Sequence, residues 1–122
     1  MFEDERTGDE LGEWAPGSGQ RVLLSTAPDE ATAAKLARAL VEARLVACVN
    51  LVPGARSIYR WEGKVEDATE TLMIIKTTEA SAPAVASLLR REHPSTCPEL
   101  VAYDVTSGLG AYLAWMTAES SG

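Results

Sequence analysis

Residues 47–64 read ACVNLVPGARSIYRWEGK and decide how the rest of the chain is arranged. Valine, isoleucine, tyrosine and tryptophan recur through this stretch, and these residue types favour the pleated, half-buried surface of a strand. Pro53-Gly54 interrupts the stretch, and such a pair is typical of a β-bulge or an edge position. Glu62-Gly63 fits a two-residue hairpin turn with the glycine at positive φ. With a return strand over Val65–Thr77, the sequence predicts a long, bent β-hairpin.

The segments on either side of the hairpin predict two more strands and three helices. A helix is expected after Pro28, because apolar residues recur there at three- and four-residue steps. Ser81 is a favourable N-cap for a second helix, which Pro94 ends. The remaining elements are strands at Arg21–Thr26 and Leu100–Val105 and a last helix from Ala111 to about Ala118.

The order of these elements is βαββαβ followed by a helix. Two right-handed crossovers around a mixed sheet give the ferredoxin-like split βαβ arrangement, an α+β fold with a long bent hairpin and a C-terminal helix. The length of 122 residues fits one domain. We assign residues 21–122 to this domain.

Residues 1–20 differ from the rest of the chain in composition. They hold six acids and one base of a chain whose formal net charge is −7, so the remainder carries only −2. Glycine, proline and acids dominate the segment, and we expect a disordered extension. Because the chain is acidic and has no basic cluster, we expect no binding to nucleic acid.

The cysteines and the hydropathy suggest a cellular compartment. Cys48 falls in a strand and Cys97 in a loop, a pattern that does not resemble a disulfide framework. No apolar run is long enough to span a membrane, and no secretory signal is evident. We therefore expect a cytoplasmic protein that does not associate with membranes.

His93 and Cys97 are the candidate metal ligands. Their spacing brings an imidazole and a thiol within reach of one ion, and such soft ligands suit copper or zinc, with Glu99 able to add a carboxylate. Structural roles explain the same residues. A histidine at a helix C-terminus satisfies capping and the helix dipole, and a free cysteine is commonly a small buried hydrophobe.

Lys76 and three aromatic residues are candidates for a ligand-binding cleft. Alternation along the strand places Leu72, Ile74 and Lys76 on one face, which we expect to be the core face. A lysine there needs an acid, and Glu99 is its natural partner; an anion-binding role is the alternative. The aromatic residues fit a core, an interface or a ligand-stacking wall; they are Tyr59, Trp61 and Trp115.

The chain carries no recognisable enzyme signature. It has no G-x-S-x-G elbow, no phosphate-binding loop and no nucleophile-base pair of familiar spacing. The first strand-helix loop also lacks the arginine that an acylphosphatase-like site would use. We therefore expect no catalysis.

Several short motifs together resemble the CutA family of divalent-cation-tolerance proteins. The hairpin supplies ACVN, PG and S-x-Y-x-WEGK, and the match covers roughly residues 21–118 in the family's order and spacing. The other pieces are Thr26-Ala27-Pro28-Asp29-Glu30, Ile75-Lys76-Thr77, His93-Pro94 with Pro98-Glu99, and Tyr112-Leu113 with Trp115. The resemblance implies the ferredoxin-like fold, a homotrimer and a role in metal-ion tolerance, with copper or another divalent cation bound.

The chain departs from the family at positions linked to metal. Ser25 and Ser107 stand where some members have cysteine and histidine, and Ser95 follows His-Pro where tyrosine is usual. The resemblance therefore leaves Cys48, His93 and Cys97 as ligands.

A second hypothesis is a sensor or scaffold trimer that binds a small anionic molecule in its subunit clefts, by analogy with other ferredoxin-like trimers.

The length of the hairpin independently indicates assembly. Leu45–Trp61 would extend roughly 50 Å, beyond a domain about 30–35 Å across, and its free edge would need a neighbouring subunit.

Overall fold

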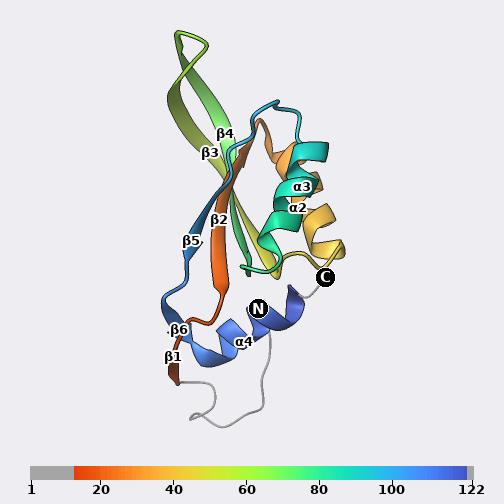
Figure 1. Ribbon diagram of the computed structural model, residues 1–122. Helices are drawn as coiled ribbons and strands as arrows, with labels where there is room; N and C mark the ends of the chain where they lie inside the picture. Colours follow the sequence, from red (N-terminus) through yellow and green to blue (C-terminus); the bar gives the residue numbers. More distant parts are fainter. Residues whose placement is uncertain (1–12, 121–122) are drawn as a thin grey trace.

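Residues 13–120 are described in the computed structural model, where they form an α+β fold with two layers. Helices α2 and α3 pack against one face of a four-stranded sheet (Figure 1). The elements follow the order β1 (Trp14–Pro16), β2 (Gln20–Ala27), α2 (Glu30–Glu42), β3 (Cys48–Trp61), β4 (Lys64–Thr78), α3 (Ala82–Glu92), β5 (Val101–Asp104), β6 (Ser107–Leu109) and α4 (Gly110–Glu119).

The sheet has the strand order β3-β4-β2-β5, and each neighbouring pair is antiparallel. The connections β2–α2–β3 and β4–α3–β5 each skip one strand, which is the ferredoxin-like arrangement that the sequence predicts. The expectation of a mixed sheet is wrong. The strands joined by each crossover are parallel to one another, but another strand lies between them.

The β3–β4 hairpin is the longest feature of the sheet, and its far half extends beyond the helices (Figure 1). Its register shifts between Val52 and Ala55, which confirms the bulge predicted at Pro53-Gly54. Gly54 has φ +81°, a backbone conformation that glycine adopts without strain. The turn has positive φ at both Glu62 and Gly63, as a two-residue primed turn requires.

The core lies between the sheet and the two helices. From β4 it receives Met73 and Ile75, both fully buried, so the core face of this strand carries the odd-numbered residues. The prediction that Leu72, Ile74 and Lys76 form the core face is therefore wrong. These residues are only half-buried, on the face that α2 and α3 leave uncovered.

Helix α2 begins at a side-chain cap. Asp29 has extended backbone geometry, and its carboxylate accepts a 2.7 Å hydrogen bond from the Thr32 amide. That bond stabilises the ionised form and holds the pKa of Asp29 below its ordinary value of 3.8. Ser81 occupies the N-cap position of α3 as predicted, but its hydroxyl donates to the Ser120 carbonyl instead of capping the helix.

The described structure begins before the boundary that the sequence indicates. Strand β1 pairs with β6, and Gln20 is 2% exposed at the start of β2. The Gln20 amide donates to the Leu113 carbonyl at 3.1 Å and to the Thr117 hydroxyl at 2.9 Å, both on α4. Residues 13–20 are therefore part of the fold. The expectation of disorder for residues 1–12 lies outside the described residues.

Candidate functional site

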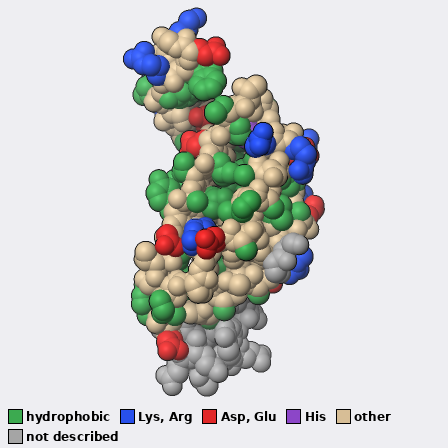
Figure 2. Space-filling model, in the orientation of Figure 1, with side chains coloured by type: hydrophobic (Ala, Val, Ile, Leu, Met, Phe, Trp, Pro, Cys, Tyr) green, Lys and Arg blue, Asp and Glu red, His purple; other side chains and the backbone are tan. Residues whose placement is uncertain are grey.

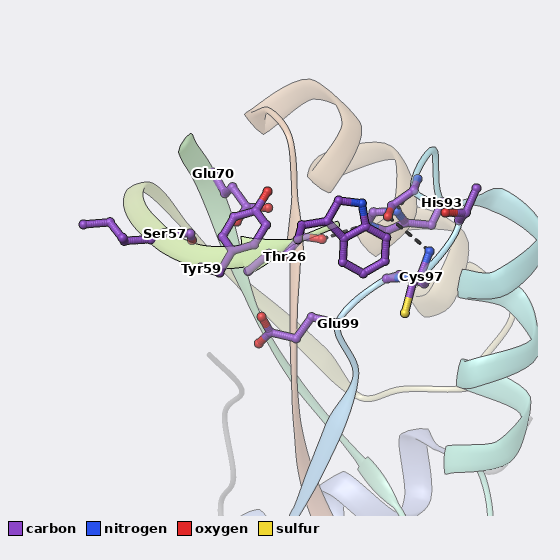
Figure 3. A pocket seen from close by; sticks show the side chains of 12 residues that line it. Thr26, Ser57, Tyr59, Glu70, His93, Cys97 and Glu99 are labelled. Carbon is purple, nitrogen blue, oxygen red and sulfur yellow. Dashed lines mark hydrogen bonds between the residues drawn. The ribbon is translucent and has the colours of Figure 1, made fainter. Parts of the chain in front are cut away.

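A cavity of about 630 Å³ lies between the β3–β4 hairpin and the loop that follows α3 (Figure 3). Its size is within the range of small-molecule sites. The hairpin contributes two aromatic rings and a carboxylate, and the loop contributes an imidazole, a thiol and a second carboxylate. In chain order these six residues are Tyr59, Trp61, Glu70, His93, Cys97 and Glu99.

His93 ties the loop to the sheet. Its Nε2 lies 2.7 Å from the carbonyl oxygen of Thr26 at the end of β2, and the Ser95 amide donates to its Nδ1 at 3.0 Å. Because Nδ1 accepts, the proton of the neutral ring belongs on Nε2, which donates to Thr26. Both ring nitrogens are therefore engaged, and a metal ion would have to displace one of these hydrogen bonds.

Cys97 is exposed at the rim of the cavity. Its thiol is free, and its amide donates to the Ser95 hydroxyl at 3.3 Å. The sequence expectation that His93 and Cys97 lie near each other agrees with their shared cavity. Among the described residues, however, no group of three or more His, Cys, Asp or Glu side chains could hold a metal ion.

Cys48 lies away from this pair. It faces Lys76 across the β3–β4 ladder, whereas Thr26 faces Leu72 across the β2–β4 ladder. The difference in register puts Cys48 roughly 13 Å along the sheet and two strand spacings, roughly 10 Å, from the position of Thr26. Within one chain, Cys48 does not share an ion with His93.

The cleft residues named from the sequence separate into two places. Tyr59, Trp61 and Glu99 line the cavity, but Lys76 and Trp115 do not. Lys76 instead places its ammonium 5.9 Å from the centre of the Tyr112 ring, and that ring lies 5.3 Å from the ring of Trp115. The expected Lys76–Glu99 ion pair does not form, because Lys76 lies at the α4 end of the sheet and Glu99 at the hairpin end.

Glu70 is the charged lining residue that sequence reasoning missed. It lies two residues before Leu72, the partner of Thr26, on the same face of β4, and it faces Ala55 across the hairpin. The alternation along β4 was the available signal. Using it required the register beyond the bulge, which the sequence does not give.

The other face of the hairpin is occupied by an ion pair. Arg56 donates to both carboxylate oxygens of Asp67, at 2.9 and 2.7 Å. These hydrogen bonds lower the pKa of Asp67 and raise that of Arg56. Since Arg56 and Tyr59 alternate on the strand, this guanidinium points away from the cavity side. No lysine or arginine lines the cavity among the described residues.

Ser25 and Ser107 lie at the positions that the family resemblance links to metal. Ser25 is fully buried, and its hydroxyl donates to the Glu99 carbonyl at 2.7 Å, which fixes the end of the loop. Ser107 begins β6, the strand that pairs with β1. In this chain Ser25 therefore holds the end of the loop, and Ser107 is part of the two-stranded β1–β6 sheet.

Comparison with known proteins identifies the family. Residues 21–119 match the family model described as CutA1 divalent ion tolerance protein. The divalent-cation tolerance protein CutA of Pectobacterium atrosepticum is 47% identical over 97 residues, which are 80% of this chain and 88% of that protein.

Solved structures agree in fold. CutA from Synechococcus elongatus has a TM-score of 0.86 and 35% identity, covering 92% of this chain and 99% of that one. The protein described as the periplasmic divalent cation tolerance protein CutA from Archaeoglobus fulgidus has a TM-score of 0.81 and 34% identity, covering 84% and 99%. This chain belongs to the CutA1 divalent ion tolerance protein family.

Proposed function

We propose that this protein contributes to tolerance of divalent cations by binding a soft metal ion, copper foremost, without catalysing a reaction. Membership of the CutA1 family supports the role in tolerance. The observation that carries the choice of ion is local: His93 and Cys97 line one cavity. Copper binds imidazole and thiolate ligands more favourably than harder cations do.

Metal binding at this place requires a local exchange of partners. Copper needs a lone pair on the imidazole, so either the Ser95 amide must release Nδ1, or Nε2 must give up both its proton and its hydrogen bond to the Thr26 carbonyl. The exposed Cys97 thiol can turn toward the ion without disturbing the core. Further ligands would come from another subunit or from water, because no third His, Cys, Asp or Glu of the described residues is placed to complete a metal site with this pair.

We also propose that the working form is a homotrimer joined through the hairpin, and that it is cytoplasmic. Exposed apolar side chains on the far half of the hairpin support assembly, since Ile58 is 63% exposed and Val65 65%. Figure 2 shows hydrophobic side chains at the hairpin and across the middle of the same view. The free thiols Cys48 and Cys97 suit a reducing compartment. Within residues 13–120, no helix has the length and hydropathy that crossing a membrane would need.

Binding of a small molecule is the second candidate, and the volume of the cavity favours it. The anionic ligand expected from the sequence fits poorly, because Lys76 lies elsewhere and both lining charges are carboxylates. A small-molecule role therefore calls for a different class of ligand.

Calorimetric titration with copper tests the metal proposal. His93→Ala and Cys97→Ser should each weaken binding at least about tenfold, a usual effect of removing one metal ligand or its support. Cys48→Ser is the matched control, because it removes the chain's other thiol at a distance from the cavity, and it should leave affinity unchanged. Equal affinity in all four proteins would remove this site from consideration.

A further inference from the structure

The lining of the cavity has a single sign of charge. Glu70 is half-buried at the hairpin and Glu99 is exposed at the end of the loop, and neither forms an ion pair with any described residue. His93 contributes no charge in the hydrogen-bonded arrangement described above. Two guanidiniums lie close by in sequence, and neither lines the cavity. Arg56 is held by Asp67 on the opposite face of the hairpin, and Arg60 alternates with Tyr59 and Trp61, which places it on that opposite face as well. The cavity therefore attracts cations.

Aromatic rings form another part of the wall. Tyr59 and Trp61 are 44% and 46% exposed, although rings of this size bury most of their surface when they belong to a core. Tyr59 and Trp61 are two residues apart, so their side chains lie on the same face of β3. This is the face of the hairpin that also carries Glu70. Figure 3 shows Tyr59 and Glu70 extending from the hairpin and Glu99 from the facing loop. Aromatic faces bind organic cations through the ring quadrupole.

We propose that this cavity binds a small organic cation, an alkylammonium or guanidinium, with its head between the carboxylates of Glu70 and Glu99 and its stem against the Tyr59 and Trp61 rings. This goes beyond the metal proposal, because it uses different residues and a different class of ligand. A bare metal ion gains little from aromatic walls and would leave most of about 630 Å³ unfilled. An organic cation of several heavy atoms uses the charge, the rings and the volume together.

The assembled full-length protein is titrated with butylammonium and butylguanidinium, with binding followed by NMR shifts of the tryptophan indole signals. Butanol and butyrate are the uncharged and anionic controls of the same stem. The cations should bind at least about tenfold more tightly than either control. Equal binding of the cations and butanol, or tighter binding of butyrate, would overturn the proposal.

Charge-removing variants of nearly unchanged shape identify the residues. Glu70→Gln and Glu99→Gln should each weaken butylammonium binding about fivefold, and Tyr59→Leu should do the same by removing a ring. Glu42→Gln and Trp14→Leu remove a carboxylate and an exposed ring outside the cavity, and they should stay within about twofold of wild type. Unchanged affinity in both cavity glutamine variants would contradict the site, whatever Tyr59→Leu does to folding.

The chain itself carries cations that could take this place in an assembly, since Arg60 and Lys64 are exposed near the hairpin turn. The double variant Arg60→Ala/Lys64→Ala tests whether a side chain of another copy or a free ligand occupies the cavity. Equal affinity in this variant and wild type supports a free ligand. Binding that appears only in the variant would show that another copy's side chain fills the cavity, and it would overturn the proposal.

Copper and butylammonium are titrated in separate experiments, so the metal proposal and the organic-cation proposal can be contradicted independently. Cys97→Ser should lose copper and keep butylammonium, because its thiol is not part of the carboxylate and aromatic set. Glu70→Gln should weaken butylammonium more than copper. A parallel loss of both ligands in both variants would mean that the cavity has collapsed as a unit, and it would contradict the assignment of separate residues.

Discussion

The Nε2 atom of His93 lies 2.7 Å from the carbonyl oxygen of Thr26, so the end of α3 is hydrogen-bonded to the end of β2. The same ring accepts a hydrogen bond from the Ser95 amide two residues later. A single side chain therefore fixes both the sheet side and the loop side of the cavity. The position of Cys97 depends on it, because Cys97 lies on the loop that begins after His93, whereas Glu99 at the end of that loop is also held by the Ser25 hydroxyl.

The ring of His93 is expected to be the Nε2–H tautomer in the metal-free protein at neutral pH. It is the only histidine in the chain, so its ring ¹⁵N signals can be assigned without ambiguity. Nitrogen-proton correlation spectra should place the proton on Nε2. A dominant Nδ1–H form would contradict the hydrogen bond from Ser95.

Removal of the ring should loosen the loop locally. In His93→Ala the Ser95 amide loses its acceptor, so its hydrogen exchange should accelerate, while amides of the core strand residues Met73 and Ile75 keep their protection. Ser87→Ala, which removes an exposed hydroxyl from the preceding helix, is the control. Uniform acceleration throughout the sheet would mean that His93 supports the whole fold and not the loop alone.

Local signals in the sequence were sufficient for much of this site. Pro94 ends α3 directly after His93, and the short spacing to Cys97 brings the two residues to one cavity. The assignment of Lys76 failed for a physical reason. Both faces of β4 are apolar, with Leu72 and Ile74 on one and Met73 and Ile75 on the other, and alternation alone does not tell which face the helices cover.

The hairpin illustrates the same limit. Its bulge and turn were predictable because proline and glycine restrict or extend the backbone at known positions. The position of Glu70 on the same face of the hairpin as the aromatic rings was not predictable, because it depends on the register after the bulge. The pairing of β1 with β6 was also missed, since each of these strands has only three residues, too short a pattern to distinguish a strand from a loop.

Asp29→Ala should lower the melting temperature by a few degrees at neutral pH, because the Thr32 amide loses its cap. The pKa of Asp29 is lowered in the folded state, so its contribution is present above the ordinary value of 3.8 and is lost as pH falls through the folded pKa. The difference in melting temperature between wild type and Asp29→Ala should therefore be constant above about pH 5 and should become smaller below pH 3.8.

Asp29→Asn provides the matched control for this dependence. Asparagine caps a helix but does not titrate, so the gap between Asp29→Asn and Asp29→Ala should not change with pH. Thermal unfolding followed by circular dichroism between pH 7 and pH 3 measures both gaps. A wild-type gap that widens in acid would reverse the sign and contradict the ionised cap.

Gly54→Ala should destabilise the protein by about 1 kcal/mol, because φ is +81° at this position and a Cβ is strained there. No atom lies within 4 Å of the added Cβ, so the cost is conformational and not a clash. Chemical denaturation at fixed protein concentration measures it, with Ser57→Ala on the same strand as the control. A neutral Gly54→Ala would show that the bulge relaxes to ordinary strand geometry.

The last prediction concerns assembly. β3 has 14 residues and extends roughly 45 Å at about 3.3 Å each, and its far half lies beyond the helices. Since one chain has a mass of 13.0 kDa, a trimer should give about 39 kDa in light scattering at micromolar concentration. Trp61→Glu should dissociate it, because a charge would replace a half-exposed apolar ring on the part of the hairpin that we propose joins the subunits.

Trp14→Glu is the matched control, since that ring is 70% exposed on β1, away from the hairpin, and its replacement should leave the mass near 39 kDa. A wild-type protein that is folded and monomeric at 13 kDa would contradict the role given to the hairpin. The exposed rings of Tyr59 and Trp61 would then be explained by the cavity alone. A trimer that survives Trp61→Glu unchanged would instead place the contact on the uncovered sheet face, where Val101 and Tyr103 are also exposed.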